Sequence, residues 1–384
     1  MYDFDSIIDR RSTDSFKWDV GENELPMWVA DMDFAAAPEI VEAFSERLKH
    51  GIFGYCKLND EWYDAYTEWW KRRHGLEMDR DGLIFASGVV PAILSVVKHL
   101  TSPGDRIIML TPMYNHFYSC ISENGRRIEE VELVYNGEGY SIDFDKLKAA
   151  MKDSDSHLMI FCNPQNPTGT IWSREEIYRI GELCRRYDIT VISDEIHCDI
   201  ITPGKEYVPF ASVSENCRDI SITCIAPTKA FNLAGLQSAA LYVYQEELRK
   251  RVSFAVQRDE LSMPNTFASA AAVAAFTNGE AWLSELNEYI YENKKAVNEY
   301  LNNELSGIKA VKGDAAYLMW LDCTALDIGS RKLSKMIREK SGLYLMSGSH
   351  YGKGGNGFLR MNVACPRALL YDGLDRLKAA VGSL

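Results

Sequence analysis

The sequence predicts an α/β protein in which a largely parallel sheet has helices on both faces. Between residues 83 and 244, short runs of consecutive apolar, β-prone residues alternate with helical patterns. Continuous apolar character indicates strands that are covered on both faces, as in parallel sheets. The six runs are residues 83–86, 106–110, 157–162, 189–193, 219–225 and 239–244.

Two of the intervening segments have clear helical patterns. Residues 89–100 are apolar nearly all round, which predicts a buried helix. The segment 173–187 begins with Ser173 and Glu176, the spacing of a capping box, and continues with an apolar stripe at helical spacing. Strand–helix alternation of this kind favours a sheet that binds ligands at the carboxyl ends of its strands.

The character of the chain changes after about residue 280. A long polar helix is predicted over 280–305, and a more mixed segment follows it. We interpret the helix as a connector into a smaller α+β domain with which the N-terminal segment packs. The expected division is a large domain of residues 46–284 and a small domain formed by residues 1–45 and 285–384.

Composition limits the classes of partner and the compartment. The chain has 384 residues and a formal net charge of −13, which argues against nucleic acid and anionic membranes as partners. No apolar run is long enough to span a membrane. The nine cysteines are scattered without a CxxC motif, and the first residues are polar and acidic, so we expect reduced thiols and a cytoplasmic protein.

Polar residues follow four of the predicted strands at the point where each strand ends. In a parallel sheet these ends meet at one edge, although the residues are far apart in the sequence. The residues are Thr111 and Tyr114, Asn163 and Asn166, Asp194, Glu195 and His197, and Thr228 and Lys229.

Each of these residues also has a structural interpretation. Asp194 could cap a helix, the "NPQNPTG" segment could be a plain turn, Tyr114 could be a buried aromatic residue with a solvated hydroxyl, and Lys229 could extend to the surface. The "DEIH" segment suggests a metal site, but no second histidine or cysteine pair accompanies it, so we predict no metal. All of the structural interpretations would have to hold together to remove the site.

Seven motifs, in order and across almost the whole chain, carry a resemblance to a known family. The chain resembles a fold-type I pyridoxal-phosphate (PLP) enzyme of the class I/II aminotransferase superfamily. Within it, the chain is most similar to the MalY/PatB group of cystathionine β-lyase-like carbon–sulfur lyases. This implies a mostly parallel seven-stranded sheet and PLP as cofactor. The motifs are "MWVADMDF" (27–34), "FGYC" (53–56), "SGVVPAI" (87–93), "NPQNPTG" (163–169), "SDEIHCDI" (193–200), "APTKAFNLAGLQ" (226–237) and "FLRMNVACPR" (358–367).

The resemblance assigns roles around the cofactor ring. It implies that Lys229 binds PLP covalently and moves protons, and burial among apolar residues would favour the neutral amine that this requires. Asp194 matches the aspartate that keeps the pyridine nitrogen protonated. Asn166 matches the partner of the ring hydroxyl, and Tyr114 the aromatic residue on the ring face.

Other positions match the phosphate and substrate contacts. The N–H groups of Val89 and Val90 open a helix and can meet the phosphate, with Thr228 as a hydroxyl donor. By resemblance, Tyr55 reaches the phosphate of the neighbouring subunit, which implies a homodimer. Arg360 matches the arginine that binds the carboxylate of a small amino-acid substrate.

Three positions depart from the broader superfamily. Ala226 and Gln237 stand where many aminotransferases have a serine and an arginine on the phosphate, and His197 stands where a tyrosine is common. His197 is assigned to the cofactor site without a defined role. These changes favour the β-lyase-like group over an aspartate-type aminotransferase.

The expected activity is that of a PLP-dependent carbon–sulfur β-lyase. It would cleave L-cystathionine or cysteine S-conjugates to a thiol, pyruvate and ammonia. One alternative is a class I/II aminotransferase acting on an L-amino acid, and a second is a PLP-fold protein that serves regulation or binding. The presence of Lys229, Asp194, Asn166 and Arg360 argues against the second alternative.

Overall fold

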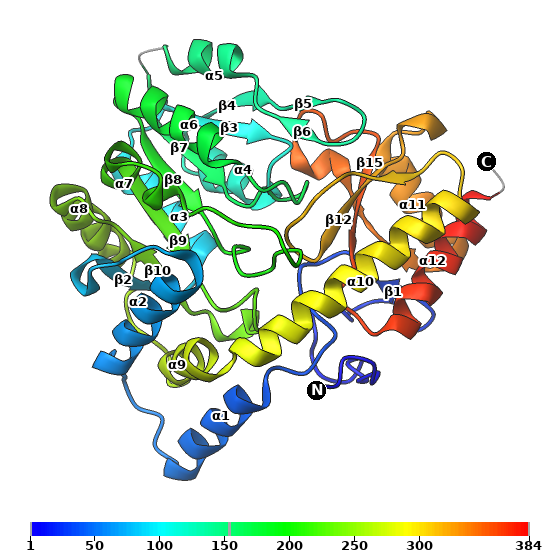
Figure 1. Cartoon of the computed structure of the whole chain (residues 1–384), viewed down its shortest axis with the longest axis horizontal. Coiled ribbons are helices and arrows are strands. Elements are labelled where there is room, and N and C mark those ends of the chain that lie inside the picture. Colours follow the sequence, from blue (N-terminus) through cyan, green and yellow to red (C-terminus); the bar gives the residue numbers. More distant parts are fainter. Residues whose placement is uncertain (1, 153–154, 383–384) are drawn as a thin grey trace.

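The computed structural model describes residues 2–152 and 155–382, which are built around two main sheets (Figure 1). The larger sheet has the strand order β2-β10-β9-β8-β7-β3-β4. Only β10 is antiparallel to its neighbours, so the predicted mostly parallel α/β sheet is confirmed. The strands are β2 (Leu83–Ala86), β3 (Arg106–Thr111), β4 (Arg127–Glu132), β7 (Ser156–Cys162), β8 (Thr190–Asp194), β9 (Ser221–Ile225) and β10 (Ala239–Tyr242).

Helices cover both faces of this sheet, as the continuous apolar strands predict. In β3, Ile107 and Met109 belong to one buried cluster with α3, α4 and α8, while Ile108 and Leu110 belong to another with α5, α6 and α7. Side chains alternate along a strand, so both faces of β3 need apolar residues. The helices are α3 (Val89–Leu100), α4 (Asn115–Ser122), α5 (Phe144–Met151), α6 (Arg174–Arg186), α7 (Glu215–Ile220) and α8 (Glu246–Arg258).

The sequence patterns locate most of these elements closely. The helix predicted over 89–100 matches α3, and the capping box of Ser173 and Glu176 begins α6. The run predicted from residue 219 is a strand only from Ser221, because α7 continues to Ile220. The prediction missed β4, which lies at the sheet edge and contains four charged residues.

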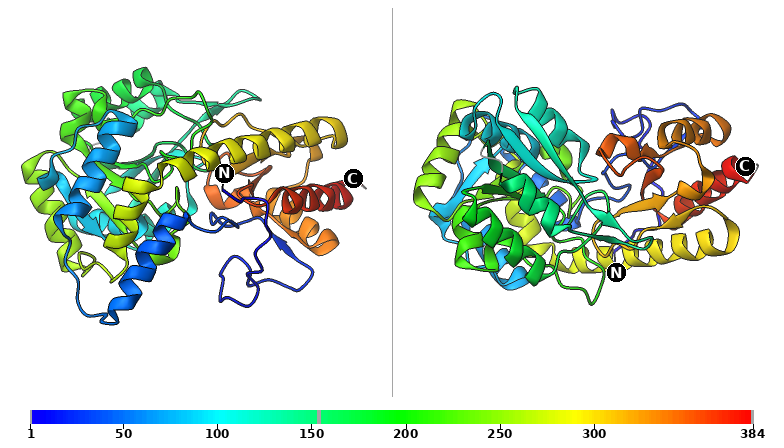
Figure 2. Two further views of the ribbon diagram at one scale, coloured as in Figure 1. Left: turned by 60° about the horizontal axis from the view of Figure 1, so that its bottom comes forward. Right: turned by 90° about the horizontal axis from the view of Figure 1, so that it is seen from above.

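The smaller sheet is antiparallel, in the order β11-β12-β15-β14, and α10 runs from the larger body alongside it (Figures 1 and 2). The predicted long helix is confirmed as α10 (Glu280–Glu304). The elements of this part are β11 (Lys309–Ala310), β12 (Leu318–Asp322), β14 (Met346–Ser347), β15 (Phe358–Asn362), α11 (Ser330–Ser341) and α12 (Arg367–Val381).

The N-terminal region contacts both parts. Strand β1 (Leu25–Pro26) pairs in parallel with β13 (Leu343–Tyr344) beside the smaller sheet. Helix α1 (Pro38–His50) and helix α2 (Asp60–His74) pack against α9 (Ala268–Asn278) in the larger body. The boundaries of 46–284 and of 1–45 with 285–384 stay a prediction. A two-stranded ribbon, β5 (Val134–Tyr135) with β6 (Tyr140–Ser141), completes the strands.

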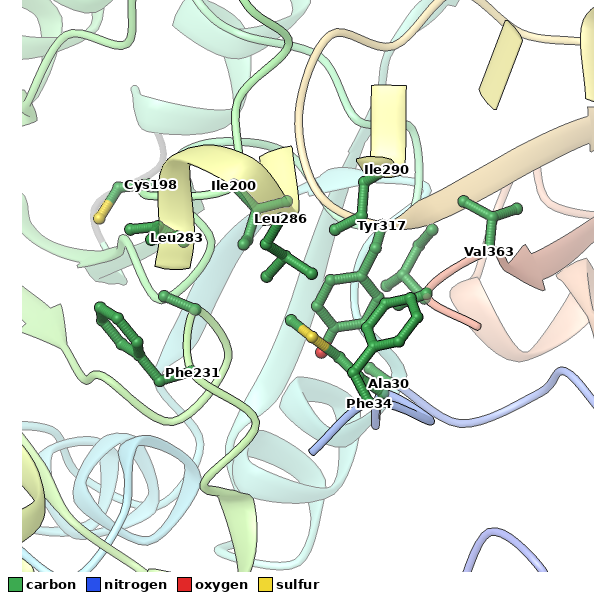
Figure 3. Packing of buried hydrophobic residues seen from close by; sticks show 14 of the residues in the cluster. Ala30, Phe34, Cys198, Ile200, Phe231, Leu283, Leu286, Ile290, Tyr317 and Val363 are labelled. Atoms are coloured by element: carbon green, nitrogen blue, oxygen red, sulfur yellow. The ribbon is translucent and has the colours of Figure 1, made fainter. Parts of the chain in front are cut away.

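One apolar cluster joins the two parts of the molecule. Leu283, Leu286 and Ile290 on α10 pack in it with residues of the N-terminal segment and of the smaller body (Figure 3). Ala30, Phe34, Tyr317 and Val363 belong to the same cluster. Across the described ranges, no helix has both the length and the apolar composition that crossing a membrane requires.

Candidate active site

A cavity of about 240 Å³ lies at the carboxyl edge of the seven-stranded sheet. It brings together eight residues that the sequence singled out: Val89, Val90, Tyr114, Asn166, Asp194, His197, Thr228 and Lys229. These residues come from the segments that follow β2, β3, β7, β8 and β9, so the expected convergence of strand ends is observed. The further lining residues had no predicted role in the site, namely Ala30, Ser87, Gly88, Pro91, Ile196, Ala234, Gln237 and Ser238.

Lys229 is partly buried in the turn that follows β9. Its Nζ donates a hydrogen bond to the main-chain oxygen of Ala30, at 2.7 Å. Burial, reinforced by the positive charge of Arg360, lowers the Lys229 pKa to about 8, although Asp31 and Asp194 act in the opposite direction. An amine with this pKa is partly neutral near pH 7 and is therefore able to attack an aldehyde.

Asp194, the last residue of β8, is buried with few partners. Only 4% of it is exposed, and its carboxylate accepts a hydrogen bond from the Ile196 N–H at 3.2 Å. Burial raises the pKa of Asp194 to about 7, against the opposing effects of that hydrogen bond and of Lys229. A protonated ring nitrogen at this carboxylate would favour its charged form.

His197 is neutral and has an unused ring atom. It is 3% exposed, and burial, followed by the charges of Lys229 and Arg360, lowers its pKa to about 3. Its Nδ1 has no hydrogen-bond partner within the described part of the chain. A neutral imidazole can donate through one nitrogen and accept through the other, so His197 offers the cavity a hydrogen-bonding group without charge.

Arg360, on β15, connects the smaller sheet to the cavity. It is 3% exposed, and its guanidinium donates to Asn166 Oδ1 at 3.1 Å and to the Trp28 main-chain oxygen at 3.0 Å. Its Nε has no partner, and no carboxylate of the described residues lies within 4.0 Å of it. Arg360 is not itself a lining residue, but Asn166 links it to the cavity.

The N-terminus of α3 supplies main-chain donors. Gly88 caps this helix with a φ of 140°, which favours glycine over other residues. The N–H groups of Val89 and Val90 open the helix beside the cavity, and Pro91 has no N–H. The buried Thr228 lies in the same lining. Such a helix terminus suits a phosphate group.

The two tyrosines differ in position. Tyr114, just before α4, lines the cavity with its ring 5.4 Å from that of Phe117, and burial raises its pKa. Tyr55 lies on the segment between α1 and α2, is 98% exposed, and is not part of the cavity of its own chain. The structure therefore brings all the predicted cofactor residues together except Tyr55.

Comparisons with known proteins agree on one family. A model described as aminotransferase class I and II matches residues 21–377. Cystathionine beta-lyase PatB of Bacillus subtilis is 42% identical, over 98% of this chain and 99% of that protein. Protein MalY of Escherichia coli is 32% identical over 99% of both chains. The crystal structure of cystalysin from Treponema denticola, which contains pyridoxal 5'-phosphate, is 33% identical with a TM-score of 0.96, covering 100% of this chain and 99% of that chain.

Proposed function

This chain belongs to the class I and II aminotransferase family, as its motifs predicted, and we propose that it is a PLP-dependent carbon–sulfur β-lyase. It cleaves L-cystathionine or a cysteine S-conjugate to a thiol, pyruvate and ammonia. Support comes from relatives named cystathionine beta-lyase and from a solved PLP-bound carbon–sulfur lyase of Staphylococcus hominis at 32% identity.

The observation that carries the proposal is that Arg360 is buried and has no carboxylate partner among the described residues. A buried guanidinium without a carboxylate is costly, because charge taken out of water needs a partner. The α-carboxylate of an amino acid would supply that partner, and the planar fork of arginine suits two parallel hydrogen bonds. Asn166 connects Arg360 to the cavity that Lys229 lines. A bound amino acid would therefore lie with its Cα between Arg360 and Lys229.

The residues of the cavity fit PLP. Asp194 is a buried carboxylate that lacks a cationic partner at salt-bridge distance within the described residues, as a protonated pyridine nitrogen requires. Val89, Val90 and Thr228 offer donors for the phosphate, and Lys229 offers an amine for the aldehyde. When bound, PLP withdraws electrons from the Cα of an amino acid and so stabilises the charge left by proton removal.

Each side chain then has a defined task. Arg360 holds the substrate carboxylate, and Lys229 Nζ takes the proton from Cα. When PLP is bound, Asp194 would keep the ring nitrogen protonated, Asn166 would hold the ring hydroxyl, and Tyr114 would lie against the ring. His197 is neutral, so it would offer the cofactor a hydrogen bond without opposing the charge of Asp194.

The aminotransferase alternative uses the same fold and is separated from the lyase by its products. L-cystathionine should yield pyruvate, ammonia and free thiol without any keto acid. The assay measures pyruvate and thiol with and without an added keto acid. Activity that depends strictly on the keto acid would overturn the lyase proposal and support the aminotransferase. A protein that binds PLP but converts neither substrate would support the regulatory alternative.

We also propose a homodimer in which Tyr55 donates to the phosphate in the neighbouring subunit. The full exposure of Tyr55, beside the exposed Ile52 and Phe53, supports this proposal. Tyr55→Phe should weaken PLP affinity in a verified dimer, measured by cofactor titration. The matched control is Tyr178→Phe, an exposed tyrosine on α6. Unchanged affinity in the Tyr55 variant would contradict the cross-subunit role.

The cysteines support a cytoplasmic location, which we propose for this enzyme. All nine are free thiols, and eight of them are buried. Reduced, unpaired cysteines are typical of the cytosol, where thiols are kept reduced. Fractionation of cells that produce the tagged protein would test this location.

A further inference from the structure

An irregular segment of the N-terminal region passes between Lys229 and Arg360. We name residues 28–33 the strap. It has no helix or strand of its own, yet Lys229 from the larger body and Arg360 from the smaller sheet both donate to its main chain. Ala30, in the middle of the strap, also lines the cavity and lies in the apolar cluster that joins the two bodies (Figure 3).

Side chains hold five consecutive main-chain oxygens of the strap. Arg360 donates to Trp28, Asn362 to Val29 and Lys229 to Ala30. Lys17 and Asn362 donate to the Asp31 oxygen, at 2.9 and 2.7 Å. Arg10 and Asn232 donate to the Met32 oxygen, at 2.9 and 3.1 Å. Side chains from several parts of the chain therefore hold the strap, together with the main-chain bond from the Asp33 N–H to the Ala364 oxygen.

A charged cluster lies directly behind the strap. The Arg10 guanidinium bonds both oxygens of Asp31, at 2.8 and 3.0 Å, and Asp33 at 2.9 Å. Lys17 is 1% exposed and bonds the other oxygen of Asp33 at 2.6 Å. Trp18 Nε1 also donates to Asp33. Two cations and two anions are thus paired: Lys17 and Asp33 are buried, whereas the side chains of Arg10 and Asp31 are 20% and 28% exposed. The buried Lys17–Asp33 pair is the costlier of the two to break.

We propose that Arg10 and Lys17 are positioning residues for the active site, which clamp the strap so that its main-chain oxygens hold Lys229 and Arg360 in place. The inference rests on the proposed function only for the roles of those two residues. Neither Arg10 nor Lys17 lines the cavity, so they act through Asp31, Asp33 and the strap rather than on the substrate.

The clamp also has an electrostatic effect on Lys229. The charged or titratable groups that act on Lys229 are Arg360, which lowers its pKa, and Asp31 and Asp194, which raise it. His197 lies in the same lining and is neutral. Since Arg10 neutralises Asp31, loss of the Arg10 charge should strengthen the effect of Asp31 and raise the Lys229 pKa. Loss of the Asp31 charge should lower it.

The experiment uses this difference in sign. The cofactor is removed from the full-length protein, and the rate of PLP rebinding is followed by absorbance from pH 6 to 10, which reports the pKa of the reacting amine. Arg10→Met should raise that pKa, and Asp31→Asn should lower it. In the double variant the pKa should return toward that of the wild type. Damage to the fold alone would move both single variants in the same direction.

Turnover supplies the second readout. Because a displacement of about 1 Å in a catalytic geometry costs up to about a hundredfold, Arg10→Met and Lys17→Met should lose about ten- to a hundredfold in kcat/KM for L-cystathionine. Arg10→Lys retains the positive charge but loses the planar guanidinium that bonds both oxygens of Asp31. It should therefore keep the Lys229 pKa while losing part of the turnover. This variant keeps the test decisive if Arg10→Met fails to fold.

Arg11→Met is the matched control. Arg11 is the neighbouring arginine, but its guanidinium bonds the main-chain oxygens of Gly21 and Glu24 and lies over the Trp18 ring, without contacting the strap. It should leave the Lys229 pKa and kcat/KM near wild-type values. Folded Arg10→Met and Lys17→Met enzymes with unchanged kcat/KM, or single variants whose pKa shifts share a sign, would overturn the proposal. A wild-type protein that binds PLP but releases no pyruvate would instead refute the lyase function and leave the pKa test intact.

Discussion

Two regions of this molecule contain buried charged groups. In one region these groups lack oppositely charged partners, and in the other they are paired. Asp194 lines the cavity, and Arg360 is linked to it through Asn166. Both are buried without an oppositely charged partner at salt-bridge distance within the described chain. Around Asp199 the charge is fully paired: His74 bonds the carboxylate at 2.9 Å, Arg73 at 3.3 Å and Trp69 Nε1 at 3.2 Å. Burial alone would raise the Asp199 pKa, but His74, Arg73 and Trp69 hold it below the usual value.

The difference separates structural charge from functional charge. A paired cluster satisfies its groups within the protein and stabilises the fold. An unpaired buried group reduces stability and is explained by a ligand that supplies the missing partner. Substitutions in the paired region around Asp199 should therefore change stability, and substitutions in the unpaired region at the cavity should change turnover.

The largest effect is expected from Lys229→Ala. A positioned proton-transfer group contributes about 10²–10⁴ in rate, so pyruvate release from L-cystathionine should fall by at least that factor. The free energy of unfolding should change little, because the Lys229 Nζ has a single hydrogen-bond partner among the described residues, the main-chain oxygen of Ala30. Lys205→Ala, at an exposed ion pair with Asp314, is the control and should retain activity. An active Lys229→Ala enzyme would contradict the assignment of the catalytic lysine.

Substitutions in the paired region around Asp199 should change the free energy of unfolding. Asp199→Asn leaves His74 without its carboxylate partner and Arg73, among the described residues, with only its longer ion pair to Glu280, at 3.4 Å. It should lower the free energy of unfolding by about 3–5 kcal/mol, measured by urea denaturation. The folded-state pKa of Asp199 lies below the unfolded value. Its contribution is therefore present above the unfolded pKa and is lost as the pH falls through the folded one. Asp60→Asn, at an exposed ion pair, should change stability by less than about 0.5 kcal/mol.

The substitution Arg360→Ala tests the region in which the buried charges are unpaired. A hydrogen bond to a charged group contributes about 1.5–3 kcal/mol, so kcat/KM should fall about ten- to a hundredfold, mainly through KM. The free energy of unfolding should not decrease as it does for Asp199→Asn, since Arg360 has no carboxylate to lose. The variant should still bind PLP at Lys229. Normal steady-state kinetics would show that the substrate carboxylate binds elsewhere.

The smallest expected effect concerns Glu195 and is a change in the slope with which the free energy of unfolding depends on pH. Burial raises its pKa to about 8, although Ser193 and the Phe210 N–H oppose this. The folded state therefore binds more protons than the unfolded state between pH 4.5 and 8, and stability falls as the pH rises, by at most about 1.4 kcal/mol per unit. Glu195→Gln can keep its partners Ser193, Tyr207 and Phe210 and should flatten this dependence. A slope equal to that of the wild type would place the titration on another group.

Local patterns and ordered motifs predicted most of the fold and of the cavity. Strand β2 and helix α3 have the predicted bounds, and the residues at the strand ends meet as expected, because apolar runs and turn residues act over short stretches of chain. Strand β4 was missed because its run RIEEVE is rich in charge, as edge strands often are.

The strap was beyond sequence reasoning for a different reason. Its contacts with Lys229 and Arg360 use main-chain oxygens, which every residue has, so residue identity carries no signal. The pairing of Arg10 with Asp31 is one choice among 42 basic and 55 acidic residues. Only the folded chain shows which of these charges meet. The "MWVADMDF" motif marked the segment but not the atoms that act.

The strap also sets the order in which the site can be completed during synthesis. Residues 28–33 leave the ribosome early, but the lysine bonded to Ala30 comes 199 residues later and the arginine bonded to Trp28 comes 332 residues later. Contacts of such long sequence separation form late, because the intervening chain must first be ordered. A nascent chain that still lacks β15 can assemble the larger sheet, but the strap then lacks its bonds to Arg360 and Asn362. Catalytic competence should therefore appear only after β15 has been synthesised and has paired in the smaller sheet.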